Sequence, residues 1–178
     1  MEAQSLTKIV FFLQKLEDQM ITHIVSDFSR VLLFPRDRST VEKLNTMIKR
    51  VRLEENYSFF DYFDLNDELL RFYQSLQPAV QTVIFTSGEI QEETEVKSRI
   101  AGIVKYVFSA QYHQRSKETV SSYAWLAEQL QTTSQQMLFV DDSSVNIAAA
   151  KQAGVRTVQF LNTEQTIVTM RKILGEQH

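Results

Sequence analysis

The sequence contains no cysteine. This absence excludes a disulfide framework and any metal site built on thiolates, and it is typical of proteins in a reducing compartment. No apolar run approaches the roughly 20 residues that are needed to span a bilayer. Residues 1–20 have neither a basic start nor a small-residue cleavage site, so we expect no signal peptide and no membrane association. A cytoplasmic protein is therefore the expectation.

An excess of charge of either sign is also lacking. The 19 basic and 22 acidic residues give a net charge of −3, so we expect no basic surface for nucleic acid. The chain has no internal repeat, no low-complexity tract and no linker rich in glycine and serine. Its 178 residues, 43% of them hydrophobic, suit one domain with a substantial core and room for a small insertion. The sequence does not indicate an oligomeric state.

Hydrophobic periodicity divides the chain into alternating helices and strands. Helices are predicted over 4–20, 40–52, 66–76, 89–100, 117–130, 145–153 and 163–174. Short and nearly all-apolar strands are predicted over 21–26, 80–85, 105–109, 137–140 and 155–160. Ser39 to Glu42 form a capping-box pattern at the start of the second helix. The alternation predicts an α/β fold of three layers, in which helices cover both faces of a parallel sheet of about five strands.

Polar side chains follow the first four predicted strands at their carboxyl ends, the edge where ligands bind in such folds. They are Asp27, then Thr86 and Ser87, then Lys117 in the loop after the third strand, and finally Asp141 and Asp142. One carboxylate of such a set can attack phosphorus, and others can hold Mg²⁺. Hydroxyl groups, backbone N–H groups and a lysine can hold the phosphate oxygens. The set therefore matches the needs of a phosphoryl-transfer site.

Each of these residues also has an ordinary structural explanation. An aspartate at the end of a strand is common in turns, and Thr86-Ser87-Gly88 fits a helix cap followed by a turn. Lys117 fits the solvated start of a helix. The pair Asp141-Asp142 is more specific, because two adjacent acids beside a buried strand repel each other unless a cation or donors compensate. The convergence of all these groups at one edge favours a functional site.

With these residues in this order, the chain resembles the haloacid dehalogenase (HAD) superfamily of hydrolases from Ile24 to Phe160. The stretch IVSDFSRVLLF is similar to the first motif of that superfamily, and TVIFTSG to the second. MLFVDDSSVNIAAAKQAGVRTVQF is similar to the fourth motif with the helix and strand that follow it. In the third motif Lys117 stands six residues before Tyr123, as in the form KPxPxxY, although Glu118 replaces the proline.

The resemblance implies a domain organisation and a role for each residue. A Rossmann-like core would comprise residues 1–35 and 79–178, and a small helical cap would be inserted over 36–78, with the aromatic cluster at 57–63 as its packing surface. The cap would leave the site open to a large substrate.

The catalytic residues would be Asp27, as the nucleophile that forms an aspartyl-phosphate, and Lys117, which would neutralise phosphate and nucleophile. Asp27, the carbonyl of Ser29 and Asp142 would ligate Mg²⁺, with Asp141 supporting the metal directly or through water. Thr86 and Ser87 would bind the phosphate.

Two positions depart from the pattern of the superfamily. Its phosphatases usually carry a second aspartate two residues after the nucleophile, which protonates the leaving group and then activates water. Ser29 stands at that position, and the pKa of its hydroxyl is far too high for this role near neutrality. Arg30 replaces the glycine that often follows, and its long cationic side chain would either block the site or bind an anionic substrate.

Three hypotheses are compatible with this departure. The first is a Mg²⁺-dependent phosphatase that acts on good leaving groups, such as those of acyl or aryl phosphates. The second is other chemistry of the superfamily, dehalogenation or phosphonate cleavage, the latter with a cap lysine such as Lys43 or Lys49. The third is a catalytically weak or inactive relative that binds a phosphorylated ligand or a protein partner. We rank the phosphatase first and the binding protein second, and His113 is a candidate for the missing proton donor.

Overall fold

The computed structural model describes residues 20–175. The helix predicted over 4–20 lies outside the described residues except for its last position. No helix in the described part of the chain has the length and the apolar composition that crossing a membrane requires.

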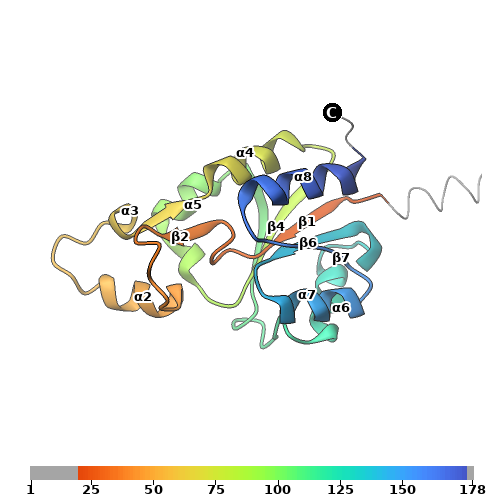
Figure 1. Cartoon of the computed structure of the whole chain (residues 1–178). Helices are drawn as coiled ribbons and strands as arrows, with labels where there is room; N and C mark the ends of the chain where they lie inside the picture. The colour runs from red at the N-terminus through yellow and green to blue at the C-terminus, as the bar shows by residue number, and fades with distance from the viewer. Residues whose placement is uncertain (1–19, 176–178) are drawn as a thin grey trace, which may run out of the picture.

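A parallel sheet of five strands forms the centre of the molecule in the order β5-β4-β1-β6-β7 (Figure 1). The strands are β1 (His23–Ser26), β4 (Gln81–Thr86), β5 (Val104–Ser109), β6 (Met137–Asp141) and β7 (Arg156–Gln159). All four pairings between neighbours are parallel. The predicted parallel α/β sheet is thus confirmed, and the strand bounds differ from the predicted ones by at most two residues. β1 lies in the middle of the sheet. Its four residues are all buried, as expected of a strand covered on both faces.

Helices cover both faces of this sheet (Figure 1). One face packs against α4 (Asp67–Ser75), α5 (Thr94–Ile100) and α8 (Thr163–Leu174), and the other against α6 (Val120–Gln129) and α7 (Ser144–Gln152). Short 3₁₀ helices, η1 (Ile90–Glu92) and η2 (Ser134–Gln136), precede α5 and β6. The sheet residues Ile24 and Ile84 belong to the first of these cores, and Val25 and Val83 to the second. Neighbouring strand residues therefore alternate between two separate hydrophobic layers.

Two short strands that the hydrophobic pattern did not predict frame the insertion. β2 (Leu33–Pro35) pairs in antiparallel fashion with β3 (Phe63–Leu65). Between them lie α2 (Leu44–Val51) and α3 (Phe59–Tyr62). The following helix, α4, contacts α8 of the main body. The division of the chain into a core and a cap over 36–78 stays a prediction.

The aromatic cluster of the insertion is a packing surface, as predicted. Phe59 and Phe63 are fully buried, and their rings stack with centroids 4.8 Å apart. Tyr57, Phe60 and Tyr62 are partly buried against the same hydrophobic core. These rings attach the insertion to the layer that contains α4, α5 and α8.

The prediction that the second helix begins at residue 40 with a capping box was wrong. α2 begins at Leu44, and Lys43 before it makes no side-chain capping bond. The hydroxyl and the backbone N–H of Ser39 both bind the carboxylate of Asp37. Ser39 therefore forms a local turn in place of a helix cap, a common alternative for short polar side chains.

Candidate active site

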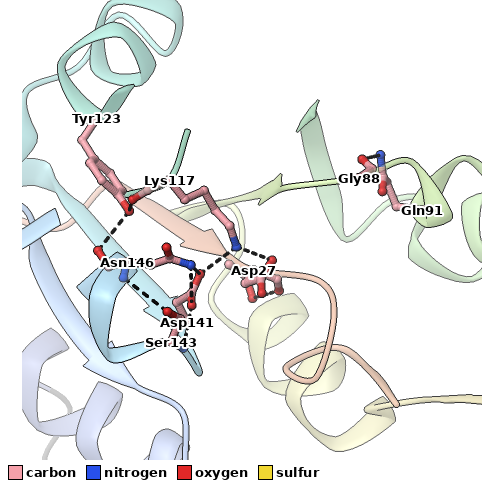
Figure 2. A network of polar contacts seen from close by, with 9 residues as sticks. Asp27, Gly88, Gln91, Lys117, Tyr123, Asp141, Ser143 and Asn146 are labelled. Atoms are coloured by element: carbon pink, nitrogen blue, oxygen red, sulfur yellow. Dashed lines mark hydrogen bonds and ion pairs between the residues drawn. The ribbon is translucent and has the colours of Figure 1, made fainter. Parts of the chain in front are cut away.

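The residues singled out at the strand ends lie at one edge of the sheet. Asp27 directly follows β1, Thr86 ends β4, and Asp141 ends β6. Because β1 pairs with both β4 and β6 in parallel, the three carboxyl ends lie side by side. Lys117 reaches this edge from the loop between β5 and α6 (Figure 2).

Two hydrogen bonds fix the backbone of Asp27, and a third supports one of them. Its N–H group donates to the carbonyl of Val140 on β6 at 2.8 Å. The hydroxyl of Ser26 donates to the carbonyl of Asp27 at 2.8 Å, and the hydroxyl of Tyr73 on α4 donates to Ser26 at 3.2 Å. The neighbouring strand β6 and, through Ser26, helix α4 therefore hold the backbone from which the carboxylate extends.

Lys117 bridges two carboxylates in the interior of the site (Figure 2). Its Nζ lies 2.7 Å from Oδ1 of Asp27 and 2.8 Å from Oδ2 of Asp141. Lys117 and Asp27 are each 5% exposed, and Asp141 is fully buried. Ion pairs at these distances are charge-assisted hydrogen bonds, and burial protects them from screening by salt.

The six-residue spacing between Lys117 and Tyr123 has a structural explanation. The hydroxyl of Tyr123, on the first turn of α6, lies 2.7 Å from the carbonyl of Lys117 and 3.1 Å from that of Asn146. Tyr123 is itself fully buried. Its phenol thus fixes the backbone from which the lysine side chain extends and joins α6 to α7.

Asp141 receives donors on both of its oxygens. Oδ1 accepts from the N–H of Ser143 at 2.8 Å and from Nδ2 of Asn146 at 3.0 Å, and Oδ2 accepts from Lys117 and, at 3.1 Å, from Asn146. This set fills the roughly four acceptor positions of a carboxylate. Asn146 was not among the predicted site residues. The signal that could have found it is its place in the first turn of α7, five residues after Asp141.

Burial and charge shift the pKa values of the site. Burial raises the pKa of Asp27 to about 6, with Lys117 acting against the rise and Asp141 adding to it. Burial alone would lower the pKa of Lys117, but Asp27 and Asp141 raise it above its ordinary value. Burial, and then Asp141, also raise the pKa of Asp142. Burial is therefore the largest cause of the raised pKa values of Asp27 and Asp142, and the charge of Asp141 adds to it.

The same three carboxylates are grouped as metal ligands would be. One oxygen from each of Asp27, Asp141 and Asp142 lies within 4.8 Å of the others. Asp142 is exposed, and within residues 20–175 the carbonyl oxygen of Ser29 accepts no hydrogen bond. Three carboxylates against one buried ammonium group favour a divalent cation, and oxygen donors are what Mg²⁺ prefers. The residues present therefore fit a magnesium ion.

The other predicted site residues lie in different environments. Thr86 is buried, and its carbonyl accepts from the N–H of Ala110, whereas Ser87 is exposed. The guanidinium of Arg30 donates to the carbonyls of Thr40 and Glu42. In the described part of the chain, the buried hydroxyl of Ser29 has no hydrogen-bond partner.

His113, the candidate proton donor, belongs to an aromatic cluster. Its ring packs against Phe108, Tyr112 and Trp125 with centroid distances of 5.8, 5.1 and 5.0 Å. No hydrogen bond or ion pair joins it to Asp27 or Lys117 among the described residues. Ring packing is the role that these contacts assign to it.

A family model of the haloacid dehalogenase-like hydrolases matches residues 12–154, most of the chain. The chain belongs to this family. No curated protein matches the sequence.

Solved structures of the family share its fold. A predicted HAD-like family hydrolase from Porphyromonas gingivalis is 16% identical, with a TM-score of 0.58 over 89% of this chain and 100% of its own. A wild-type HAD-family enzyme from Bacteroides thetaiotaomicron, solved with magnesium and inorganic phosphate, is 11% identical, with a TM-score of 0.54 over 78% of this chain and 93% of its own. A 2-haloacid dehalogenase from Pseudomonas syringae is 12% identical, with a TM-score of 0.61 over 88% of this chain and 99% of its own. Identities this low show a common fold.

Proposed function

We propose that this HAD-like hydrolase is a Mg²⁺-dependent phosphatase that acts through an aspartyl-phosphate on Asp27. The observation that carries the proposal is the buried bridge from Asp27 through Lys117 to Asp141. It holds Oδ1 of Asp27 against an ammonium group, and Oδ2 would be the oxygen that attacks phosphorus. The family membership supports hydrolase chemistry in general. The Bacteroides enzyme with bound magnesium and phosphate supports the choice of a magnesium-dependent phosphatase.

Asp27, Asp142 and the carbonyl of Ser29 would hold the magnesium ion. When bound, the ion supplies positive charge that neutralises the phosphoryl oxygens. Asp141 orients Lys117 in place of ligating the ion, because protein donors already occupy its oxygens. The proposal thus sets aside direct ligation of the metal by Asp141, which was one of the two roles expected from the sequence.

The chain's own residues account for the transfer step. An oxygen of Asp27 attacks phosphorus, the bond between phosphorus and the leaving oxygen breaks, and the leaving group departs with the bonding electrons. Lys117 lies beside Asp27 and stabilises the negative charge that gathers on the phosphoryl oxygens. Thr86 and Ser87 supply donors for these oxygens. Water then attacks phosphorus, which releases phosphate and restores the carboxylate.

Ser29 limits the substrates to good leaving groups. Proton transfer by a positioned acid or base contributes about 10²–10⁴-fold in rate, and the Ser29 hydroxyl has no buried partner that would activate it. Acyl and aryl phosphates lose a stable anion and need no proton at that stage. We therefore propose substrates of this kind.

The test is hydrolysis of acetyl phosphate and p-nitrophenyl phosphate with Mg²⁺, measured for the wild type and for Asp27→Asn. We expect turnover by the wild type that depends on Mg²⁺ and is lost in the variant. Equal rates for the two proteins would remove the enzyme proposal.

A second candidate function is the binding of a phosphorylated ligand without turnover. The unpartnered hydroxyl of Ser29 favours it, because the position that would carry the acid and base holds neither. Calorimetric titration with inorganic phosphate and Mg²⁺ separates the two proposals. Binding without hydrolysis of either phosphate substrate supports this second candidate.

A further inference from the structure

Arg30 has a backbone conformation that is unfavourable for its residue type. Its φ is 63°, in the left-handed region that glycine adopts freely and that a long side chain disfavours. Two hydrogen bonds of the loop impose this shape. The N–H of Arg30 donates to the carbonyl of Leu33 at 2.7 Å, and the N–H of Leu33 donates to the carbonyl of Phe28 at 2.8 Å. An arginine in this place therefore needs a compensating contact.

The guanidinium group makes that contact with the chain just before α2. Its Nη2 donates to the carbonyl of Thr40 at 2.8 Å and to the carbonyl of Glu42 at 3.1 Å. A helix that began at residue 40 would use the Thr40 carbonyl for the N–H of Leu44. The start of α2 at Leu44 is consistent with this competition. Arg30 thus joins the loop of Asp27 to the entry of α2.

α2 forms one wall of a pocket beside the proposed phosphate site. The pocket has a volume of about 290 Å³ and is lined by Asn45 and Lys49 of α2 and by Ser87 and Gly88 after β4. The two walls approach so closely that a Cβ atom on Gly88 would lie 2.2 Å from the amide of Asn45. Because Ser87 and Gly88 directly follow Thr86, the pocket borders the residues proposed to bind the phosphate.

The size and lining of the pocket define the group that it suits. A water molecule takes about 30 Å³ of the liquid, so the pocket has room for a group of roughly ten non-hydrogen atoms. No ion pair engages Lys49 among the described residues, and Asn45 adds an amide. Arg52, Glu89 and Glu92 also line the pocket, so it offers both donors and acceptors to a small polar leaving group.

We propose that Arg30 is a positioning residue, which holds the entry of α2 so that the pocket between α2 and residues 87–90 receives the leaving group. The kinetic part of this inference rests on the proposed phosphatase function, whereas the contact between Arg30 and the cap stands without it. Arg30 acts on the affinity for leaving groups that fill the pocket. Its Nη2 binds carbonyl oxygens of Thr40 and Glu42, so the role proposed for it is to position α2 and not to bind the transferred phosphate.

Hydrogen exchange tests the contact without any need for activity. Arg30→Asn is the variant of choice, because asparagine tolerates the left-handed conformation but is too short to reach residues 40–42. We expect exchange of the N–H groups of Thr46 and Met47, the first turn of α2, to accelerate by about tenfold or more. Arg50→Ala is the matched control, since it removes an exposed arginine that binds the carboxylate of Glu42. Exchange that is unchanged in Arg30→Asn, or equally fast in Arg50→Ala, would overturn the proposal.

Two substrates test the effect on the pocket. The p-nitrophenolate group fills it, whereas the acetate of acetyl phosphate does not. For Arg30→Asn we expect KM for p-nitrophenyl phosphate to rise about fivefold or more with kcat within about twofold, and KM for acetyl phosphate to change far less. An equal rise for both substrates would instead place Arg30 on the phosphate and contradict the inference. If the wild type hydrolyses neither substrate, the phosphatase proposal fails, and the exchange experiment still decides the role of Arg30.

Discussion

Asp27→Asn should make the metal-free protein more stable near neutral pH. The folded structure confines Asp27, Asp141 and Lys117 in the interior, two carboxylates against one ammonium group. Burial raises the pKa of Asp27 from 3.8 to about 6, so ionisation of this group is harder in the folded than in the unfolded chain. The amide is nearly isosteric with the carboxyl group, and it leaves one buried carboxylate paired with one buried ammonium.

The magnitude and the pH dependence follow from that shift. A pKa difference of about two units corresponds to about 3 kcal/mol as an upper bound. We expect a gain of about 1–2 kcal/mol, or about 3–6 °C in Tm, because the amide binds Lys117 less well than the carboxylate does. The folded state binds more protons than the unfolded state between pH 3.8 and about 6. The wild type therefore loses stability as the pH rises through this range, and the advantage of the variant is largest above it.

Thermal unfolding in EDTA between pH 4.5 and 8, followed by circular dichroism, measures this difference. Asp61→Asn, at an exposed aspartate, is the control for the change in net charge and should shift stability by less than about 0.5 kcal/mol. Most of the gain in Asp27→Asn should disappear by pH 4.5. A variant that is no more stable than the wild type at pH 7.5, or a gain independent of pH, would refute the electrostatic account.

Three further substitutions test other parts of the site. Lys117→Met should destabilise the metal-free protein by about 3–5 kcal/mol in urea unfolding, because it leaves buried carboxylates without their cation. The double variant with Asp27→Asn should recover part of this loss. A Lys117→Met protein as stable as the wild type would contradict the prediction. Tyr123→Phe should cost about 1–3 kcal/mol and lower kcat, since the carbonyls of Lys117 and Asn146 lose their donor; an unchanged kcat would remove its positioning role. Ser29→Asp should raise the hydrolysis of alkyl phosphates by about 10²–10⁴-fold if the missing acid and base limit the rate; no gain at any pH would mean that another group moves the proton.

The sequence predicted the sheet well because its strands are buried on both faces. Such strands are short continuous apolar runs, and their ends are marked by the first polar residue. That is why Asp27, Thr86 and Asp141 were each placed at a strand end. In a parallel sheet the strands end at one edge, so this common edge followed from the predicted fold, whereas the β1–β6 pairing that brings Asp27 beside Asp141 required the structure. The pairing of Lys117 with both of them required the structure.

The insertion was harder to predict because long-range contacts decide its local structure. β2 and β3 have three residues each, too few for a periodic pattern, and they form only by pairing with each other across residues 36–62. Arg30, ten residues before Thr40, occupies the Thr40 carbonyl that a helix starting at residue 40 would use. Helix propensity near residue 40 could not reveal that competition.

Side-chain amides were missed for a related reason. Asn146 lies on a helix that reads as small and apolar, and only the turn after β6 brings its amide to both oxygens of Asp141. Asparagine has no charge, so the pattern of acidic and basic residues that indicated Asp27, Lys117 and Asp141 did not indicate Asn146. The role of Asp141 as an acceptor for protein donors became clear only with this partner.

Rapid acid quench during turnover of acetyl phosphate with Mg²⁺, followed by peptide mass spectrometry, tests the central claim most directly. The account predicts one phosphoryl group on the carboxylate of Asp27 in the wild type and none in Asp27→Asn. Release of phosphate by the wild type with the phosphoryl group on another residue, or with undiminished turnover in Asp27→Asn, would contradict it.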